Sequence, residues 1–476
     1  MGECMATENT HFGAERIGKA LADCKSIFFI GIGGINMSSL AHISKKRGYT
    51  VGGSDRARSA LTERLSAEGI EIFYSHDENN IEGYDAVVYT VAISPENPEY
   101  LRARERGIPC FSRADYLGYI MTGYERRIGI SGMHGKSTCT SMCAYALIEG
   151  GADPTVLSGA ELPVMGGAYT VGGDKNFLFE ACEYMDSFLD FNPTVAVVLN
   201  IEMDHVDYFK SLEQIRASYA KFAALTGENG YAVYNSDDEN VRSALADYKG
   251  NRISFAVDDE NADLRAVNIT EKGQRYSFDV IAEGGVLCHI DLSVTGRHNI
   301  YNALAAVAVC RLCGLDRSRI EIGLGGFSGA ARRMEKKGSV NCAPVFDDYG
   351  HHPTEVAATL RGALGLRENG GRLFCLFQPH TYSRTHALFD DFAEALSVAD
   401  RVLLANIYAA RETDTLGVSS ELLANKIGHK AFYCQSLDEA AKILKKEMKK
   451  GDAAVVMGAG DVYKIFSILD FDEEEK

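Results

Sequence analysis

The sequence predicts an α/β protein built from three domains. Three successive blocks of the chain alternate short apolar runs with helical stretches, which is typical of parallel sheets covered by helices. The apolar runs end in glycine or in polar residues, and 476 residues are enough for several domains of about 150 residues each. We place the three domains at residues 1–122, 123–333 and 334–476.

The first block opens with a strand at residues 27–30, the glycine turn GIGGIN at 31–36 and a helix that ends near Gly48. The turn approaches the dinucleotide-binding pattern, but Asn36 stands where that pattern requires glycine. The next strand ends at Asp55, where a carboxylate can accept hydrogen bonds from a ribose. The turn therefore suits a diphosphate, with a purely structural turn or a nicotinamide site of an oxidoreductase as alternatives.

The second block begins with RRIGISGMHGKSTCTSM, residues 126–142, which places a Gly-Lys-Ser turn between an apolar strand and a helix. Ile130 occupies the position of the first glycine in the standard phosphate-loop pattern. Backbone N–H groups at a helix start bind anions, Gly135 permits close approach, Lys136 adds a charge, and Ser137 can bind Mg²⁺. We expect the turn to bind a nucleoside triphosphate; a tight turn with an incidental lysine is the alternative.

Carboxylates and a histidine follow two further apolar strands of the second block. They are Glu180 and Glu183 after one strand, and Asn200, Asp204, His205 and Asp207 after the other. Because parallel strands end at one edge of the sheet, these side chains should lie near Lys136. Carboxylate oxygens suit Mg²⁺, and an imidazole can complete the shell when phosphate supplies the rest.

The second block continues with short alternating strands at residues 252–295, a possible side sheet, and a strong helix at 297–314. Four strands of the third block then end in the polar loops GHHPTE, PHTYSRTH, AARETDTLG and AGD. Ligands of open parallel sheets bind at such strand ends, so the four loops together indicate a binding edge. Helix capping and surface polarity explain His352 and His386 equally well without a ligand.

The composition excludes several classes of protein. A net charge of −17 argues against nucleic acid or an anionic membrane as a general partner. No apolar run reaches the length of a membrane span, and the N-terminus lacks the features of a signal peptide. Most of the twelve cysteines are scattered singly, and the one C-x-x-C, at residues 310–313, has no second cysteine pair to complete a metal site; this usage favours the cytoplasm. Zinc-protease and serine-hydrolase motifs are missing from the sequence.

The motifs of all three blocks resemble those of the Mur ligases, in the same order. They are GIGGINMSSLA, GMHGKST, FEACEYMDSFL, NIEMDHVDYF, GRHNIYNALAAVAV, RRMEKKG, FDDYGHHPTEV, FQPHTYSRT and VMGAGDV, between about residues 27 and 462. The resemblance implies a Rossmann-like UDP-binding domain, a central P-loop-type ATPase domain and a C-terminal Rossmann-like domain. It also implies that ATP converts a substrate carboxylate into an acyl phosphate, which an amine then attacks.

The resemblance is strongest to the branch that joins L-alanine to UDP-N-acetylmuramate, the first amino-acid addition to the peptidoglycan stem peptide. It implies ATP contacts from Gly132, Met133, His134, Gly135, Lys136, Ser137, Thr138, Asn299, Asn302, Arg333 and Asp348. It implies catalytic roles for Lys136, Tyr349, His351, His380 and Arg384. Mg²⁺ would bind Ser137, Glu180 and His205. UDP would bind Gly31, Gly33, Gly34, Ile35, Asn36, Met37, Ser54 and Asp55.

Some positions depart from the usual sequence motifs of the family. Cys182, Tyr184 and Met185 replace an acidic, serine-rich stretch, and Thr381 stands where an arginine is frequent, which leaves one fewer cation for the substrate. Two alternatives to the alanine ligase stay open: a sister ligase that adds a preformed peptide to the same sugar nucleotide, and a non-catalytic nucleotide-binding protein on the same scaffold. The sequence leaves the oligomeric state open between monomer and dimer.

Overall fold

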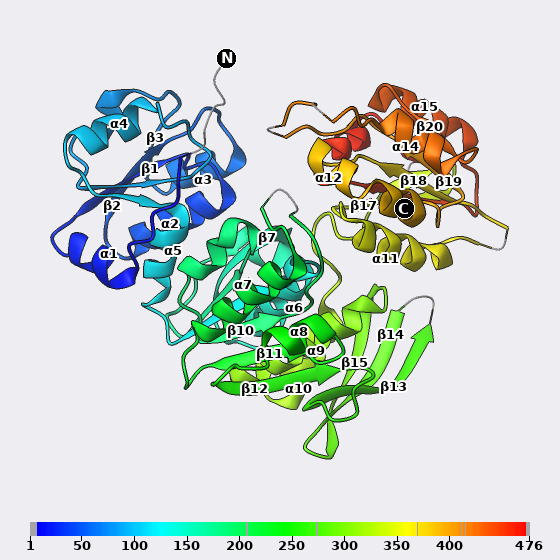
Figure 1. The fold of residues 1–476 in the computed structure, drawn as a ribbon, viewed down its shortest axis with the longest axis horizontal. Coiled ribbons are helices and arrows are strands. Elements are labelled where there is room, and N and C mark those ends of the chain that lie inside the picture. The colour runs from blue at the N-terminus through cyan, green and yellow to red at the C-terminus, as the bar shows by residue number, and fades with distance from the viewer. Residues whose placement is uncertain are drawn as a thin grey trace.

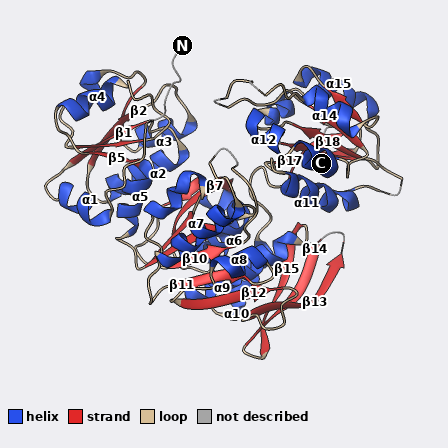
Figure 2. Ribbon diagram, in the orientation of Figure 1, coloured by secondary structure: helices blue, strands red, loops and turns tan. Residues whose placement is uncertain are grey.

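A computed structural model of the chain describes residues 7–205, 208–272, 275–368, 370–410, 412–414 and 416–472. Three lobes follow one another along the chain, and the first and third both rest on the second (Figure 1). Each lobe has a sheet with helices packed against it, as predicted for an α/β protein (Figure 2). The proposed boundary at 122/123 falls between α5 and β6, and the one at 333/334 falls between α10 and β16.

The N-terminal sheet has five parallel strands in the order β3-β2-β1-β4-β5. Its strands are β1 Ser26–Ile30, β2 Thr50–Ser54, β3 Glu71–Phe73, β4 Ala86–Tyr89 and β5 Cys110–Ser112. Its helices are α1 Ala14–Ala20, α2 Ile35–Lys46, α3 Ala60–Ala67, α4 Pro98–Glu105 and α5 Arg113–Met121. Strand β1 is buried along its whole length, as its continuous apolar run predicts for a central parallel strand.

The central sheet has ten strands in the order β15-β14-β13-β12-β11-β10-β6-β9-β7-β8. They are β6 Arg126–Ser131, β7 Thr155–Leu162, β8 Gly167–Thr170, β9 Asn176–Glu180, β10 Val195–Val198, β11 Tyr231–Asn235, β12 Asn251–Ala256, β13 Leu264–Lys272, β14 Arg275–Ala282 and β15 Gly285–Thr295. The helices are α6 Lys136–Glu149, α7 Leu212–Ala224, α8 Glu239–Ala244, α9 His298–Leu312 and α10 Arg317–Gly326. Helices α6 and α9 share one apolar core over this sheet.

Residues 252–295 do not form a separate side sheet. Strand β13 pairs in parallel with β12 at Phe255–Leu264 and Ala256–Arg265, and β14 and β15 continue antiparallel from it. The predicted strands are therefore present, but they extend the main sheet (Figure 2). The helix predicted at 297–314 is confirmed as α9, and Gly314 follows it with φ +84°.

The C-terminal sheet has six strands in the order β16-β17-β21-β18-β19-β20, and all pairs except β16–β17 are parallel. They are β16 Glu335–Val340, β17 Ala343–Asp348, β18 Leu373–Phe377, β19 Arg401–Leu404, β20 Ala431–Tyr433 and β21 Ala453–Met457. The helices are α11 Pro353–Ala363, α12 Tyr382–Ala387, α13 Phe389–Leu396, α14 Ser420–Ile427 and α15 Leu437–Glu447. The four strands predicted for this block are β17, β18, β19 and β21.

Two further findings concern the described residues as a whole. None of their helices is both long enough and apolar enough to cross a membrane. The cysteines among them are all free thiols, and several lie in the core under α6 and α9.

Candidate active site

A cavity of about 1150 Å³ lies between the central and C-terminal domains and extends to the N-terminal domain. The central domain contributes the phosphate loop and the start of α9, and the C-terminal domain contributes the end of β17 and the start of α11. Eight of the lining residues are His134, Gly135, Thr138, Asn299, Asn302, Arg333, Asp348 and Glu355. The N-terminal domain reaches the same cavity with Ile35, Leu61 and Arg64. The cavity thus joins the predicted ATP residues to all three domains.

The phosphate loop runs from the end of β6 at Ser131 to the start of α6 at Lys136. Gly135 has φ +81°, and a Cβ there would lie 2.7 Å from Asn302 Oδ1, so a side chain at this position would be both strained and crowded. The side chain of Asn200, after β10, accepts the N–H of His134 at 2.8 Å and donates to its carbonyl at 3.0 Å. The neighbouring strand therefore fixes the shape of the loop.

Lys136 Nζ points back onto its own loop. It donates to the carbonyl of Gly132 at 2.5 Å and to both carboxylate oxygens of Glu183 at 3.0 and 3.1 Å. Glu183 is fully buried, and His205 Nε2 lies 3.0 Å from its Oε1. Burial opposes the charges, but this pairing raises the pKa of Lys136 and lowers that of Glu183, so both are ionised. The sequence placed Glu183 at a strand end and expected it near Lys136, which these contacts confirm, but the resemblance gave it no role in the site.

The hydroxyl and carboxylate expected to hold Mg²⁺ are adjacent. Ser137 Oγ donates to Glu180 Oε2 at 3.0 Å, and Arg333 Nη2 donates to Ser137 Oγ at 3.2 Å. Gly159 N donates to the other oxygen of Glu180 at 2.5 Å. These hard oxygen donors beside the phosphate loop fit Mg²⁺. His205 contacts Glu183 instead of this pair, and Asp207 lies outside the described residues.

Asn299 and Asn302, on the first turns of α9, form part of the cavity wall. Asn302 Nδ2 donates to Asn299 Oδ1 at 2.9 Å, and Asn299 Nδ2 donates to the carbonyl of Thr295 at 2.7 Å. Both amides are thereby oriented, and Asn302 Oδ1 faces Gly135 of the phosphate loop.

Asp348 and Tyr349 bring the end of β17 to the cavity. The carboxylate of Asp348 accepts the N–H groups of Met334 at 3.0 Å and Gly350 at 2.8 Å, and burial raises its pKa although Arg333 opposes the rise. The guanidinium of Arg333 lies 5.3 Å from the centre of the Tyr349 ring, a cation–π contact. Arg333 thus contacts both Ser137 of one domain and Tyr349 of the other.

His351 and His380 lie on loops of the C-terminal domain, and Arg384 lies near both of them on α12. The rings of His351 and His380 are 6.0 Å apart, and His380 stacks on Tyr408 at 5.5 Å. Burial lowers the pKa of His351 to about 4 and lowers that of His380 as well, so both are neutral at pH 7. Arg384 Nε donates to Asp204 Oδ1 of the central domain at 3.2 Å, and both side chains are buried.

Thr381, which departs from the family's usual motif, has φ +66°, a backbone conformation that is rare for a β-branched residue. Its N–H donates to the carbonyl of Tyr408 at 2.9 Å. The strained residue lies directly between His380 and α12, the helix that carries Arg384. Strain of this kind is concentrated at functional sites.

The glycine turn of the N-terminal domain has the geometry of an anion-binding turn. Gly31 has φ +82°, and Gly33 N donates to Asp55 Oδ2 at 2.9 Å. Gly34 is the N-cap of α2, so Ile35 and Asn36 form the exposed first turn of that helix. Two of the predicted UDP residues have buried side chains: Met37 packs in the core, and Ser54 Oγ donates to Glu99 Oε2 at 2.8 Å. Those two can offer a ligand only their backbone.

The two histidines attributed to capping and surface polarity differ. His386 is exposed, as that interpretation predicts. His352 does cap α11, because its Nδ1 accepts the N–H of Thr354 at 3.3 Å, but it is only 5% exposed and packs on His134. The surface interpretation of His352 was wrong, because the sequence does not show that the domains meet at this point.

Family models match three successive parts of the chain. The model described as Mur ligase family, catalytic domain, matches residues 26–125; Mur ligase middle domain matches 130–310; and Mur ligase, glutamate ligase domain, matches 332–460. Together these matches cover most of the chain.

Curated relatives match nearly the full length. The UDP-N-acetylmuramate–L-alanine ligase of Acetivibrio thermocellus is 44% identical over 445 residues, which is 93% of this chain and 94% of the relative. The ligase of the same name from Clostridium novyi is 45% identical over 444 residues, 93% of this chain and 96% of the relative.

Two solved structures have similar folds. The UDP-N-acetylmuramate–alanine ligase of Thermotoga maritima has a TM-score of 0.76 and 26% identity over 93% of this chain and 97% of its own. A murein peptide ligase from Psychrobacter arcticus has a TM-score of 0.68 and 25% identity over 94% of this chain and 98% of its own. By these full-length matches, the chain belongs to the Mur ligase family.

Proposed function

We propose that the chain is an ATP-dependent ligase that joins L-alanine to the carboxylate of UDP-N-acetylmuramate, the first amino-acid addition to the peptidoglycan stem peptide. One observation carries the proposal: Ser137, next to Lys136, bonds to both Glu180 and Arg333, and Arg333 and Asp348 line the cavity that the phosphate loop reaches at Gly135 and Thr138. The relatives that share about 44% of the sequence are named for this reaction. The cytoplasm is the proposed location, which the free cysteines of the described residues favour.

ATP is proposed to bind with its phosphates along residues 132–138 and its base near Asn299 and Asn302. Helix α6 begins at Lys136, so the N–H groups of its first turn and the lysine charge both favour the phosphates. When bound, Mg²⁺ would neutralise charge on the phosphate oxygens, and Ser137, Glu180 and His205 are proposed to hold it. His205 would have to leave Glu183 to take part.

The proposed chemistry has two transfers. A carboxylate oxygen of UDP-N-acetylmuramate attacks the γ-phosphorus of ATP, the bond to the β-phosphate oxygen breaks, and ADP leaves. The amine of L-alanine then attacks the acyl carbon, and inorganic phosphate leaves with the carboxylate oxygen. Negative charge develops on oxygen in both transfers, so the cations Lys136, Arg333 and Arg384 are the expected contributors.

The ammonium group of L-alanine must lose a proton to attack the acyl carbon, so the transfer requires a proton acceptor. His351 and His380 are neutral at pH 7 because burial lowers the pKa of each, so either can accept the proton of the attacking amine. Tyr349 lies beside His351 at 5.7 Å between ring centres and lines the same approach. The glycine turn, with Asp55 bonded to Gly33, is the proposed site of the UDP diphosphate.

The second candidate is the sister reaction, in which a preformed peptide replaces L-alanine. It is favoured by the likeness in fold to the murein peptide ligase, whose TM-score of 0.68 is close to that of the alanine ligase at 0.76. The identities of 43 to 45% with ligases named for alanine favour the first candidate.

A phosphate-release assay separates these candidates. The chain would be supplied with ATP, Mg²⁺ and UDP-N-acetylmuramate, and with L-alanine, glycine, L-serine or an L-alanyl tripeptide as the amine. We expect phosphate release to be fastest with L-alanine and absent with the tripeptide. Release with the tripeptide alone would favour the sister reaction, and nucleotide binding without release under any condition would favour a non-catalytic protein.

A further inference from the structure

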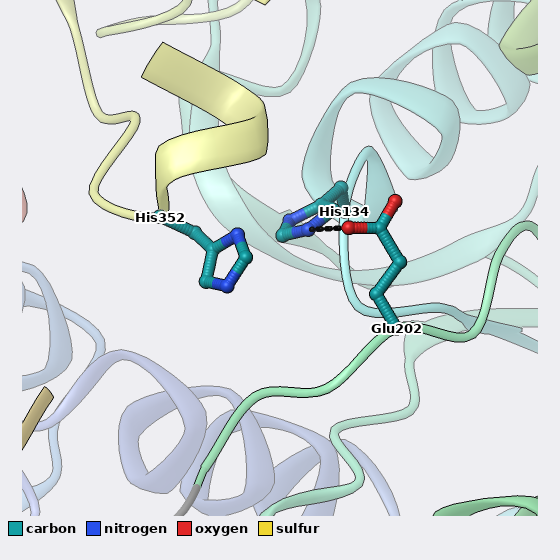
Figure 3. A group of neighbouring side chains, drawn as sticks. All are labelled: His134, Glu202 and His352. Atoms are coloured by element: carbon teal, nitrogen blue, oxygen red, sulfur yellow. Dashed lines mark ion pairs between the residues drawn. The ribbon is translucent and has the colours of Figure 1, made fainter. Parts of the chain in front are cut away.

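A group of polar residues joins the phosphate loop to the C-terminal domain, and Figure 3 shows three of them, His134, Glu202 and His352. We call it the His134 cluster, and it consists of His134, Glu202, His352, Thr354 and Glu355. His134 Nε2 lies 3.5 Å from Glu202 Oε2, and its Nδ1 lies 3.4 Å from Glu355 Oε1. The His352 ring packs against the His134 ring with centres 4.8 Å apart and planes inclined by 35°. Thr354 Oγ donates to Glu202 Oε2 at 2.8 Å.

The contacts of the cluster cross from one domain to the other. His134 and Glu202 belong to the central domain, while His352, Thr354 and Glu355 begin α11 of the C-terminal domain. Glu355 also closes the first turn of α11, because its Oε2 accepts the N–H of His352 at 3.3 Å. One carboxylate therefore binds both the start of α11 and the ring of the phosphate-loop histidine.

The charges in the cluster are complementary. Burial lowers the pKa of His134, but Glu202 and Glu355 offset this and raise it to about 9, so the ring is an imidazolium at neutral pH. The same pairing lowers the pKa of Glu202, and His351 and His134 help to hold the pKa of buried Glu355 well below its usual range. A cation on the central domain thus lies between two anions, one from each domain.

The cluster also resembles a small metal site, since donor atoms of His134, Glu202 and His352 lie within 4.8 Å of one another. Three contacts oppose that interpretation. His352 Nδ1 accepts the N–H of Thr354, Glu202 accepts the hydroxyl of the same threonine, and each ring nitrogen of His134 faces a carboxylate. His352 Nε2 has no hydrogen-bond partner and could bind an ion, but an ion at either ring nitrogen of His134 would have to displace a carboxylate contact and a proton, so the ion-paired interpretation explains more of the geometry.

The cluster has a direct consequence for the phosphate loop. The backbone of His134 is held by Asn200, and the loop turns at Gly135 immediately after it. Movement of α11 would therefore pull on the His134 ring, one residue from the glycine that approaches the phosphates. We propose that His134 is a positioning residue that couples docking of the C-terminal domain to the phosphate-binding shape of the loop; this rests on the proposed role of the loop as the ATP site.

Coupling of this kind affects nucleotide binding more than turnover. A ligand that binds the docked form more tightly can restore docking at saturation, because its binding energy shifts the equilibrium. Loss of the His134 bridge should therefore raise the KM for ATP roughly tenfold, about 1.4 kcal/mol, and change kcat less than about threefold. A purely structural defect would instead lower the amount of active enzyme and leave KM unchanged.

The test uses His134→Gln, Glu355→Gln and the double variant in the full-length chain. Glu421→Gln is the matched control, since Glu421 is an exposed acid in the first turn of α14 in the same domain. We expect each single variant to raise the KM for ATP, the double variant to raise it no further, and the control to leave it unchanged. Additive effects in the double variant, or an unchanged KM in both single variants, would overturn the proposal.

Two measurements that do not depend on ligation complete the test. Calorimetric binding of ADP should weaken in parallel with the KM, and the radius of gyration from small-angle X-ray scattering without nucleotide should increase in both single variants. These results would support the coupling even if L-alanine were not a substrate. Glu355→Gln lies outside the phosphate loop, so it tests the bridge even if His134→Gln fails to fold. One bound Zn²⁺ per wild-type chain in equilibrium dialysis, lost in His352→Ala, would assign the cluster to a metal and overturn the proposal.

Discussion

Lys136 and Glu183 form a buried ion pair at the base of the phosphate loop, and His205 contacts the same carboxylate. Burial of two charges is costly, and this pair is stabilised only because each charge compensates the other. A nucleotide phosphate near Lys136 would offer a second anion in place of Glu183. We infer that the pair holds the lysine in place before the substrate arrives.

Replacement of Lys136 by alanine tests this role. The Lys136→Ala variant should lower the rate of phosphate release by at least about 10²-fold, as expected for loss of a preorganised cation. Lys175→Ala, at an exposed lysine of the same domain, should retain the wild-type rate. Thermal unfolding of both variants would check that they are folded, and near-normal ligation by Lys136→Ala would contradict the assignment.

The pH dependence of nucleotide binding tests the charge on His134. Its pKa is raised to about 9, so its stabilising contribution is complete below about 6.5 and is lost as the pH rises through about 9. ADP affinity of the wild type should therefore fall between pH 7 and pH 9.5 by more than that of His134→Gln, which lacks the titrating group. Equal pH dependence in the two proteins would exclude the imidazolium. The titratable groups that interact with His134 are Glu202, Glu355, His352 and His298.

For individual residues, the sequence predicted which side chains belong to the site, but not every contact between them. Ser137 and Glu180 were expected together and lie 3.0 Å apart, because a strand end and a helix start meet at one edge of a parallel sheet. His205 was expected with them, yet it contacts Glu183. The choice between two carboxylates three positions apart depends on side-chain rotamers, which the sequence pattern does not encode.

The phosphate loop and helix α6 are the elements on which the site depends. Strand β6 is buried between β9 and β10, and the loop after it turns at a glycine with φ +81° that lies against Asn302. A side chain at Gly135 would therefore be strained by the left-handed backbone conformation and would clash with Asn302. Its position was evident from the sequence, because Gly-Lys-Ser between an apolar strand and a helix is a demanding pattern.

Substitution of Gly135 by alanine should raise the KM for ATP at least about tenfold, because the Cβ would meet Asn302 Oδ1 at 2.7 Å and displace the loop. Gly83→Ala is the matched control, since Gly83 has φ +83° and nothing within 4 Å of the added Cβ. The control should lose about 1 kcal/mol of stability from backbone strain and keep its KM. An equal KM in the two variants would contradict the prediction, because the contact with Asn302 would then have no effect on nucleotide binding.

Strand existence was predictable and strand pairing was not. The apolar runs of β17, β18, β19 and β21 gave all four predicted strands of the C-terminal domain. The region expected as a side sheet is instead joined to the main sheet through only the Phe255–Leu264 and Ala256–Arg265 pairs. Alternation of apolar and polar residues indicates a strand with one buried face, but it does not identify the neighbouring strand.

The whole molecule is a central domain that supports the other two (Figure 1). The C-terminal domain contacts it through three buried or half-buried bridges: Tyr349 to Arg333, Arg384 to Asp204, and the His134 cluster. The sequence listed most of these residues as separate motifs. Their meeting across a domain boundary depends on the arrangement of whole domains, which local patterns do not specify.

The Arg384–Asp204 pair provides a test of how the C-terminal domain docks on the central domain. Arg384→Ala leaves the Asp204 carboxylate buried and unpaired, which should weaken domain docking by about 3 kcal/mol and increase the radius of gyration in solution. Phosphate release should fall by at least about tenfold, because the variant also lacks the Arg384 charge that is proposed to stabilise the reacting oxygens. His386→Ala changes an exposed residue of the same helix and should leave both quantities unchanged. A compact, active Arg384→Ala variant would contradict the role of this bridge.

The most direct test follows the oxygen atoms of the substrate carboxylate. UDP-N-acetylmuramate labelled with ¹⁸O in that group would be incubated with the chain, ATP, Mg²⁺ and L-alanine, and the phosphate released would be analysed by mass spectrometry. Transfer of a phosphoryl group onto the carboxylate predicts one ¹⁸O in each phosphate released. Phosphate without the label would show that the carboxylate is not phosphorylated, and would contradict the proposed ligase chemistry at the Lys136 site.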